Sequence, residues 1–301
     1  MIIDLNEIRN YGNLELLAKQ LVEGFITGLH KSPYHGFSVE FAEHRLYNTG
    51  ESTRHIDWKV FAKTDRLYTK RFEEETNLRC NIIIDNSLSM HYPTENKGKL
   101  TFSCMAAASL AYLLHKQRDA FGLSVFSSTL DIQTEVKSTA VHLNAILQQL
   151  QSLFDQQSKN SETQIATVLH EIAKKTKRRS LIIIFSDMFE TSNDLDSTFS
   201  ALQHLKHSKH EVLLFHVTDK KTEFDFDFED KPYEFIDLEN AAKIKIQPSE
   251  LKSIYQKKAN EFYHDLKLRC GQLKIDLIET DIQEGYHNIL QSYVIKRKKM
   301  K

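Results

Sequence analysis

The pattern of apolar and polar residues changes near residue 80. Before that point the sequence predicts one helix over about Ile8–Leu29, followed by a mixed, β-rich stretch. After it, short apolar runs alternate with longer segments of helical periodicity, which predicts a doubly wound, mostly parallel α/β sheet of the Rossmann type. We therefore predict two regions, an N-terminal helical and β-rich elaboration over residues 1–79 and an α/β domain over residues 80–301.

Six short apolar segments of the second region are predicted strands. Ser180–Ser186 (S-L-I-I-I-F-S) is apolar in its interior, which is typical of a strand buried on both faces. Residues 222–246 alternate strictly at first and predict an inserted hairpin or an edge strand. The predicted strands are Cys80–Asp85, Ala120–Phe126, Leu130–Val136 (an antiparallel edge), Ser180–Ser186, Glu211–Val217 and Leu273–Ile278.

The longer segments between these strands are predicted helices. Ser249 follows Pro248 and is expected to cap the last of them. The basic end, Lys296–Lys301, is expected to be a solvated, frayed tail, with a nucleic-acid or membrane contact as the minor alternative. The predicted helices are Leu100–Gln117, Ala140–Phe154, Thr163–Lys175, Asp194–His207 and Ser249–Lys267.

Composition narrows the class of protein. The 301 residues carry a formal net charge of −1, so nothing global indicates nucleic acid or an anionic membrane as a partner. No apolar stretch reaches the roughly 20 residues that a membrane helix needs, and the N-terminus lacks the pattern of a signal peptide. The three cysteines are isolated, without C-x-x-C spacing, which suits a reducing cytoplasm. We expect a cytoplasmic protein.

Polar clusters follow two of the predicted strands. Asp85–Met90 (D-N-S-L-S-M) follows the first strand, and Ser186–Met188 (S-D-M) closes a later one. The loop Ser161–Thr163 enters a predicted helix. Ligands of open parallel sheets bind outside the carboxyl ends of the strands, so these clusters are expected to meet there.

The set resembles the metal-ion-dependent adhesion site of von Willebrand factor A domains. The resemblance rests on D-x-S-x-S at residues 85–89, a downstream threonine at a helix start, and an aspartate that closes a later apolar strand. It implies that Ser87, Ser89 and Thr163 coordinate a divalent cation, while Asp85 and Asp187 hold bound waters and orient the hydroxyls. The Gly-Gly pair that often precedes this threonine in the family is absent here.

The residue types suit Mg²⁺, which prefers six oxygen ligands and keeps several waters. Hydroxyls with at most two carboxylates leave the ion electrophilic, so that an acidic side chain from a partner can take an open position. Ligand type alone allows Mn²⁺ or Ca²⁺ equally. Taken singly, Asp85 and Asp187 could be caps, and Ser87 and Ser89 could be turn residues. Their joint placement at strand ends favours a metal site.

A closer resemblance lies upstream. The segments E-F-A-E-H-R-x-Y at 40–47, G-E-x-x-R-x-I-D-W at 50–58 and K-R-F-E-E-E at 70–75 precede the motifs at 85–90 and 178–187. This order resembles a bacterial von Willebrand factor A-like family, domain of unknown function fifty-eight, over about residues 30–190. Its members are typically associated with MoxR-type AAA+ ATPases. The resemblance implies a von Willebrand factor A-like fold and an adaptor or co-chaperone for such an ATPase.

Three upstream residues and one histidine carry separate expectations. Trp58 is the only tryptophan and is expected to pack in the core where the β-rich stretch meets the sheet. Arg54 and Asp57 are left open between a fixed ion pair and a docking surface for the ATPase. His91 is expected on an exposed loop.

Two other functions remain open. Asp85 and Asp187 could anchor the metal of a phosphohydrolase or nuclease, although the hydroxyl-rich ligands and the lack of an evident general base speak against an enzyme. No P-loop or complete H-E-x-x-H motif is present. Alternatively, the protein is a metal-free scaffold in which the motif is structural. We expect a metal-dependent protein-binding module.

Overall fold

The computed structural model describes residues 14–30, 44–46, 58–70, 78–94, 98–155, 165–189, 195–236 and 243–300. The chain divides into two compact units, Met1–Ile26 with Leu78–Lys301, and Thr27–Asn77. The helix α2 (Leu14–His30) therefore lies, up to Ile26, in the same unit as the central sheet. Among the helices of these described ranges, none is long and apolar enough to cross a membrane.

The smaller unit contains a short antiparallel pair and one helix. Strand β1 (His44–Leu46) pairs with β2 (Tyr68–Lys70), and α3 (Trp58–Thr64) lies between them in sequence. Trp58 is 61% exposed and touches Phe61 edge to face, with ring centroids 6.1 Å apart. Trp58 is thus exposed within the smaller unit, and its predicted packing against the sheet of the larger unit stays a prediction. Arg54 and Asp57 lie outside the described residues.

The larger unit is built on a six-stranded sheet with the order β10-β7-β6-β3-β4-β5. All neighbouring strands are parallel except β5, which pairs antiparallel with β4. This order confirms the predicted doubly wound, mostly parallel α/β fold and its antiparallel edge. The strands are β3 (Arg79–Asp85), β4 (Ala120–Phe126), β5 (Leu130–Gln133), β6 (Leu181–Ser186), β7 (Glu211–Thr218) and β10 (Asp276–Asp281).

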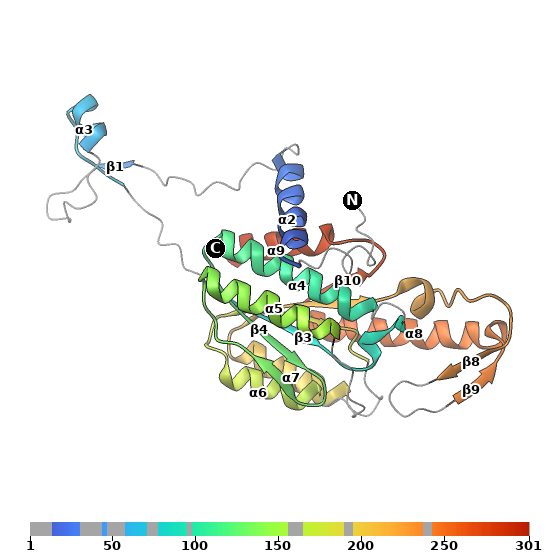
Figure 1. Ribbon diagram of the computed structural model, residues 1–301. Coiled ribbons are helices and arrows are strands. Elements are labelled where there is room, and N and C mark those ends of the chain that lie inside the picture. The colour runs from blue at the N-terminus through green and yellow to red at the C-terminus, as the bar shows by residue number, and fades with distance from the viewer. Residues whose placement is uncertain are drawn as a thin grey trace. The chain divides into compact units, whose positions relative to one another are not determined.

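Helices cover both faces of this sheet (Figure 1). Every residue of β6 is buried, as expected of a strand between two helical layers. One core cluster joins residues of α6, α7 and α8 to alternate residues of β6 and β7, and α4 contacts α5 and α9 on the other side. The helices are α4 (Gly98–Lys116), α5 (Ala140–Asp155), α6 (Ile165–Lys175), α7 (Leu195–His207), α8 (Pro248–Gln272) and α9 (His287–Met300).

The C-terminal segment is a packed helix. In α9, Ile289, Leu290, Tyr293 and Val294 recur at helical spacing and are buried. Lys296, 8% exposed, pairs with Glu211 and Asp276 at 2.7 Å each. The predicted solvated, frayed tail is therefore wrong for Lys296 and Arg297, whose side chains pair with carboxylates, whereas Lys298 and Lys299 are exposed at the end of the helix.

Two boundaries around α8 differ from prediction. The helix begins at Pro248 after the N-cap Gln247, and no side chain caps it, so the predicted cap at Ser249 is wrong. It runs on to Gln272, and Lys274 adopts a left-handed φ of 55°. Strand β10 consequently begins at Asp276 rather than at Leu273.

The segment before α8 forms the predicted hairpin. Strands β8 (Tyr233–Ile236) and β9 (Lys243–Ile246) pair antiparallel in a separate two-stranded sheet. The early alternation belongs to no strand, since residues 220–224 form a π-helical turn. Phe226 and Phe228 pack against Phe235 instead, with centroids 5.7 and 5.4 Å apart.

Candidate metal centre

The strand order creates a switch point at the carboxyl ends of β3 and β6. From β3 the chain moves to β4 on one side and later returns to β6 on the other. Open α/β sheets bind ligands at such a point. Asp85 is the last residue of β3, and Asp187 follows the last residue of β6. The structure thus brings the two predicted polar clusters together.

A hydrogen bond to Asp85 links the carboxyl ends of β3 and β6. Asp85 is fully buried. The Ser87 backbone N–H donates to its Oδ1 at 2.8 Å, and the Ser186 hydroxyl donates to its Oδ2 at 2.7 Å. The first contact forms the turn typical of Asp before a loop, and the second joins β3 to β6. With both oxygens engaged, Asp85 can orient the loop of hydroxyls that follows it.

The geometry of those hydroxyls fits a hard cation. The Oγ atoms of Ser87 and Ser89 are hydrogen-bonded to each other and lie 3.0 Å apart. Adjacent ligands of an octahedral Mg²⁺ with metal–oxygen distances of about 2.0–2.1 Å lie roughly 2.9 Å apart. The pair therefore has the donor chemistry and spacing of two neighbouring ligands. The third predicted ligand, Thr163, lies outside the described residues.

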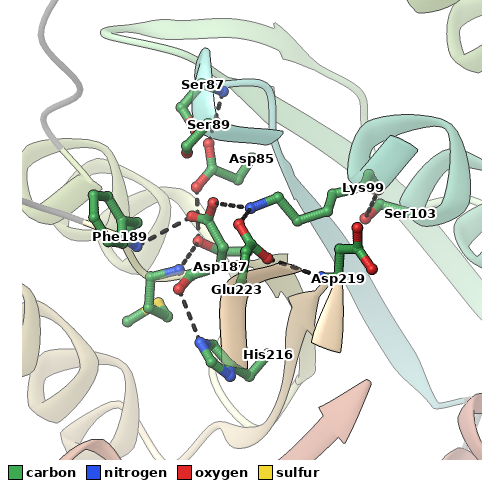
Figure 2. A network of polar contacts seen from close by, with 12 residues as sticks. Asp85, Ser87, Ser89, Lys99, Ser103, Asp187, Phe189, His216, Asp219 and Glu223 are labelled. Atoms are coloured by element: carbon green, nitrogen blue, oxygen red, sulfur yellow. Dashed lines mark hydrogen bonds and ion pairs between the residues drawn. The ribbon is translucent and has the colours of Figure 1, made fainter. Parts of the chain in front are cut away.

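The second carboxylate, Asp187, has an unpredicted partner. Lys99 of α4 is 1% exposed, and its Nζ lies 2.8 Å from Oδ2 of Asp187. The same Nζ lies 2.5 Å from Oε1 of Glu223, in the π-helical turn after β7 (Figure 2). Oδ1 of Asp187 accepts the Phe189 backbone N–H at 3.1 Å. Asp187 thus belongs both to the candidate metal site and to a buried ion pair.

Burial and neighbouring charges shift the pKa values of the carboxyl groups in opposite directions. Burial, followed by the nearby Asp187 carboxylate, raises the pKa of Asp85 to about 7. Burial also raises the pKa of Asp187, but the Lys99 ammonium outweighs it and holds that pKa below its ordinary value. Burial raises the pKa of Glu223 despite the same ammonium. One ammonium therefore pairs with two carboxylates, Asp187 and Glu223, while burial makes the third carboxyl group, Asp85, harder to ionise.

Further acceptors extend this network along β7. The backbone N–H of Asp219 donates to Oε2 of Glu223 at 2.8 Å, and the Thr222 hydroxyl donates to Oδ2 of Asp219 at 2.9 Å. Asp219 is 4% exposed, and among the described residues its Oδ1 has no hydrogen-bond partner. The Oδ1 of Asp219 is therefore a buried acceptor that a donor or a cation at this edge could satisfy.

Two histidines lie close to the site. The Nε2 of His216 lies 3.0 Å from the backbone carbonyl of Asp187, the geometry of an N–H donating to that carbonyl. Burial lowers the pKa of His216 to about 4, so its ring is neutral near pH 7. His91 is buried, with its Nε2 3.0 Å from Oδ1 of Asn86. The expectation of an exposed loop at His91 is therefore wrong.

The absence of a side chain at Gly98 lets the start of α4 approach the serine loop, which places Lys99 at the site. A Cβ at Gly98 would lie 2.2 Å from Cδ of Pro93 and 2.9 Å from the Tyr92 carbonyl oxygen. Backbone bonds hold this approach, since the N–H of Lys99 donates to that carbonyl at 3.0 Å. The start of α4 therefore packs directly on the end of the serine loop.

We expect Gly98→Ala to lower the free energy of unfolding by about 1–3 kcal/mol, as overpacking of a close contact does. Urea unfolding followed by circular dichroism measures this. Gly24→Ala is the matched control, because a Cβ at Gly24 in α2 meets nothing within 4 Å and alanine favours a helix. Equal changes in the free energy of unfolding for the two substitutions would show that the close contact at Gly98 does not exclude a side chain.

Comparison with known proteins places this architecture in a family. Residues 43–263 match the family described as Protein of unknown function DUF58. The uncharacterized proteins Rv1480 of Mycobacterium tuberculosis and Mb1516 of Mycobacterium bovis are each 23% identical over 208 residues, 69% of this chain. The chain spans 64% of the length of these curated relatives.

Solved structures that are similar to this chain share little sequence with it. The conserved hypothetical protein BatB from Bacteroides thetaiotaomicron is 13% identical, with a TM-score of 0.47 over 74% of this chain and 99% of BatB. A von Willebrand factor type A protein from Catenulispora acidiphila is 14% identical, with a TM-score of 0.36 over 64% of this chain and 43% of that one. The family match covers well over half of the chain, and the protein belongs to the DUF58 family.

Proposed function

We propose that this protein is a divalent-cation-dependent protein-binding module that serves as an adaptor or co-chaperone for a MoxR-type AAA+ ATPase. The observation that carries the proposal is the pair of hydroxyls, Ser87 and Ser89, 3.0 Å apart at the switch point of the sheet. Membership of the family supports the choice of partner, because the sequence motifs resemble proteins associated with such ATPases.

Each residue has a distinct part in this proposal. Ser87 and Ser89 supply hydroxyl ligands, and Asp85 fixes their loop through the Ser87 backbone N–H. Asp187 supports the site from β6. The cation, when bound, offers an electrophilic position to an acidic side chain of the partner. Thr163 remains the predicted third ligand, and Mg²⁺ the expected ion, with Mn²⁺ or Ca²⁺ as alternatives.

The proposal keeps the cytoplasmic location predicted from the sequence. Cys80, Cys104 and Cys270 are buried free thiols, which suits a reducing compartment.

Capture of the partner tests the proposal. We would immobilise the full chain and its Ser87→Ala/Ser89→Ala variant, then apply a purified MoxR-type ATPase in Mg²⁺ or in EDTA. The ATPase should be retained only by the unsubstituted protein in Mg²⁺. Ser152→Ala is the matched control, because its exposed hydroxyl bonds only within α5, to the Gln149 carbonyl, and it should behave as the unsubstituted protein.

Two outcomes would contradict the proposal. Retention under every condition would mean that the ATPase binds another surface without the cation. If the ATPase is never retained and the protein hydrolyses a phosphoester in Mg²⁺ or Mn²⁺, the hydrolase alternative replaces the adaptor.

A further inference from the structure

The buried lysine at the site has two carboxylate partners from different segments. Lys99 is the second residue of α4, Asp187 follows β6, and Glu223 lies in the turn after β7. The ammonium contacts Asp187 at 2.8 Å and Glu223 at 2.5 Å. Figure 2 shows it reaching between the two carboxylates, beside Asp85. A charge so deeply buried needs a partner of opposite sign, because an unpaired one is strongly destabilising.

We infer that Lys99 is the internal counter-cation of the metal site and that it competes with a divalent cation for Asp187, while Glu223 holds the lysine when the cation is bound. This inference rests on the proposed cation site and names the residues that set its affinity. No sequence motif assigns a role to either residue.

The arrangement of charges supports this division of roles. Asp187 lies between the hydroxyl loop and the lysine (Figure 2), with its Oδ2 2.8 Å from the Lys99 ammonium. Glu223 makes its other bond to the backbone N–H of Asp219 and is 26% exposed in its side chain. A cation on the serine side repels the ammonium. Glu223 can keep its ion pair with that ammonium when the cation occupies the serine side.

Two substitutions should therefore shift affinity in opposite directions. Lys99→Met keeps the length of the side chain and removes the positive charge, so we expect Mg²⁺ to bind about tenfold tighter or more. Glu223→Gln removes the alternative partner of the lysine, so we expect Mg²⁺ to bind about tenfold weaker. A purely structural lysine would not produce a gain in affinity, which makes the sign of the first shift diagnostic.

The experiment follows the melting temperature of the full chain as Mg²⁺ is added to EDTA-treated protein, since a ligand of the native state raises that temperature, and at a given concentration the rise is larger for tighter binding. Lys231→Met is the control, because this lysine is 59% exposed and its contacts, an ion pair with exposed Glu229 and a cation–π contact with Tyr233, involve no residue of the candidate metal centre. In EDTA, Lys99→Met should melt lower than the control. The rise in melting temperature on addition of Mg²⁺ should be larger for Lys99→Met than for the unsubstituted chain.

Each outcome decides the inference. Unchanged or weaker Mg²⁺ affinity in Lys99→Met overturns it, and the proposed function survives if the unsubstituted chain binds Mg²⁺. Binding by Lys99→Met but not by the unsubstituted chain supports the counter-cation and contradicts the proposed function. Binding by neither contradicts both. If Lys99→Met does not fold, Glu223→Gln decides, and an affinity equal to that of the unsubstituted chain overturns the inference.

Discussion

Replacing Asp187 with alanine is expected to lower the free energy of unfolding by about 3–5 kcal/mol, the range found when one partner of a buried ion pair is removed. Lys99 would keep its charge inside the protein with only Glu223 beside it. Asp187→Asn should cost less, because the amide keeps the volume and one acceptor oxygen for the ammonium. Urea unfolding in EDTA measures both losses without any contribution from a bound cation.

Glu171→Ala is the matched control for this substitution. Glu171 also pairs with a lysine, Lys175, at 2.6 Å, but both side chains are exposed on α6. Such a pair contributes about 0.3–0.5 kcal/mol. If Asp187→Ala were no more costly than Glu171→Ala, the buried pair would not stabilise the fold. The expected loss also makes Asp187→Ala a poor probe of metal binding, which is why serine substitutions are used for that purpose.

A second large loss is expected in the C-terminal helix. Tyr293 of α9 is fully buried, and its hydroxyl donates to Oε1 of Gln117 at 3.0 Å. Tyr293→Ala should lower the free energy of unfolding by about 3–5 kcal/mol, the usual cost of removing a buried aromatic ring. Ile295→Ala, two residues on and 46% exposed, should change it by no more than about 0.5 kcal/mol. Similar small effects in both would mean that α9 is not part of the core.

Much of the central fold was predictable because its signals are local. The apolar runs at Cys80–Asp85 and Ser180–Ser186 have the length and composition of doubly buried strands, and they form β3 and β6. The polar residues that follow them needed only the rule that ligands gather at the carboxyl ends of parallel strands. Asp85 and Asp187 accordingly meet at the switch point.

The parts that sequence reasoning missed depend on contacts between distant segments. Lys99 lies in the polar run N-K-G-K and resembles a solvated lysine until Asp187 and Glu223, 88 and 124 residues away, surround it. The same holds for Lys296, whose partners come from β7 and β10. A signal for α9 was present in the spacing of Ile289, Leu290 and Tyr293, but the basic residues that follow obscured it.

Trp58 is a different case. A single tryptophan favours a core position on composition alone, and within its own unit this one is exposed on the short helix α3. Its predicted packing against the central sheet stays a prediction. The docking role left open for the same segment stays a prediction, since Arg54 and Asp57 lie outside the described residues.

The most direct test of the central claim is calorimetric titration of Mg²⁺ into the EDTA-treated full chain and into its Ser87→Ala/Ser89→Ala variant. The account predicts saturable binding of one ion per chain by the unsubstituted protein, and loss of that binding in a variant that still unfolds cooperatively. Binding of equal strength in both proteins, or no binding by the unsubstituted chain, would contradict the assignment of this loop as a metal centre.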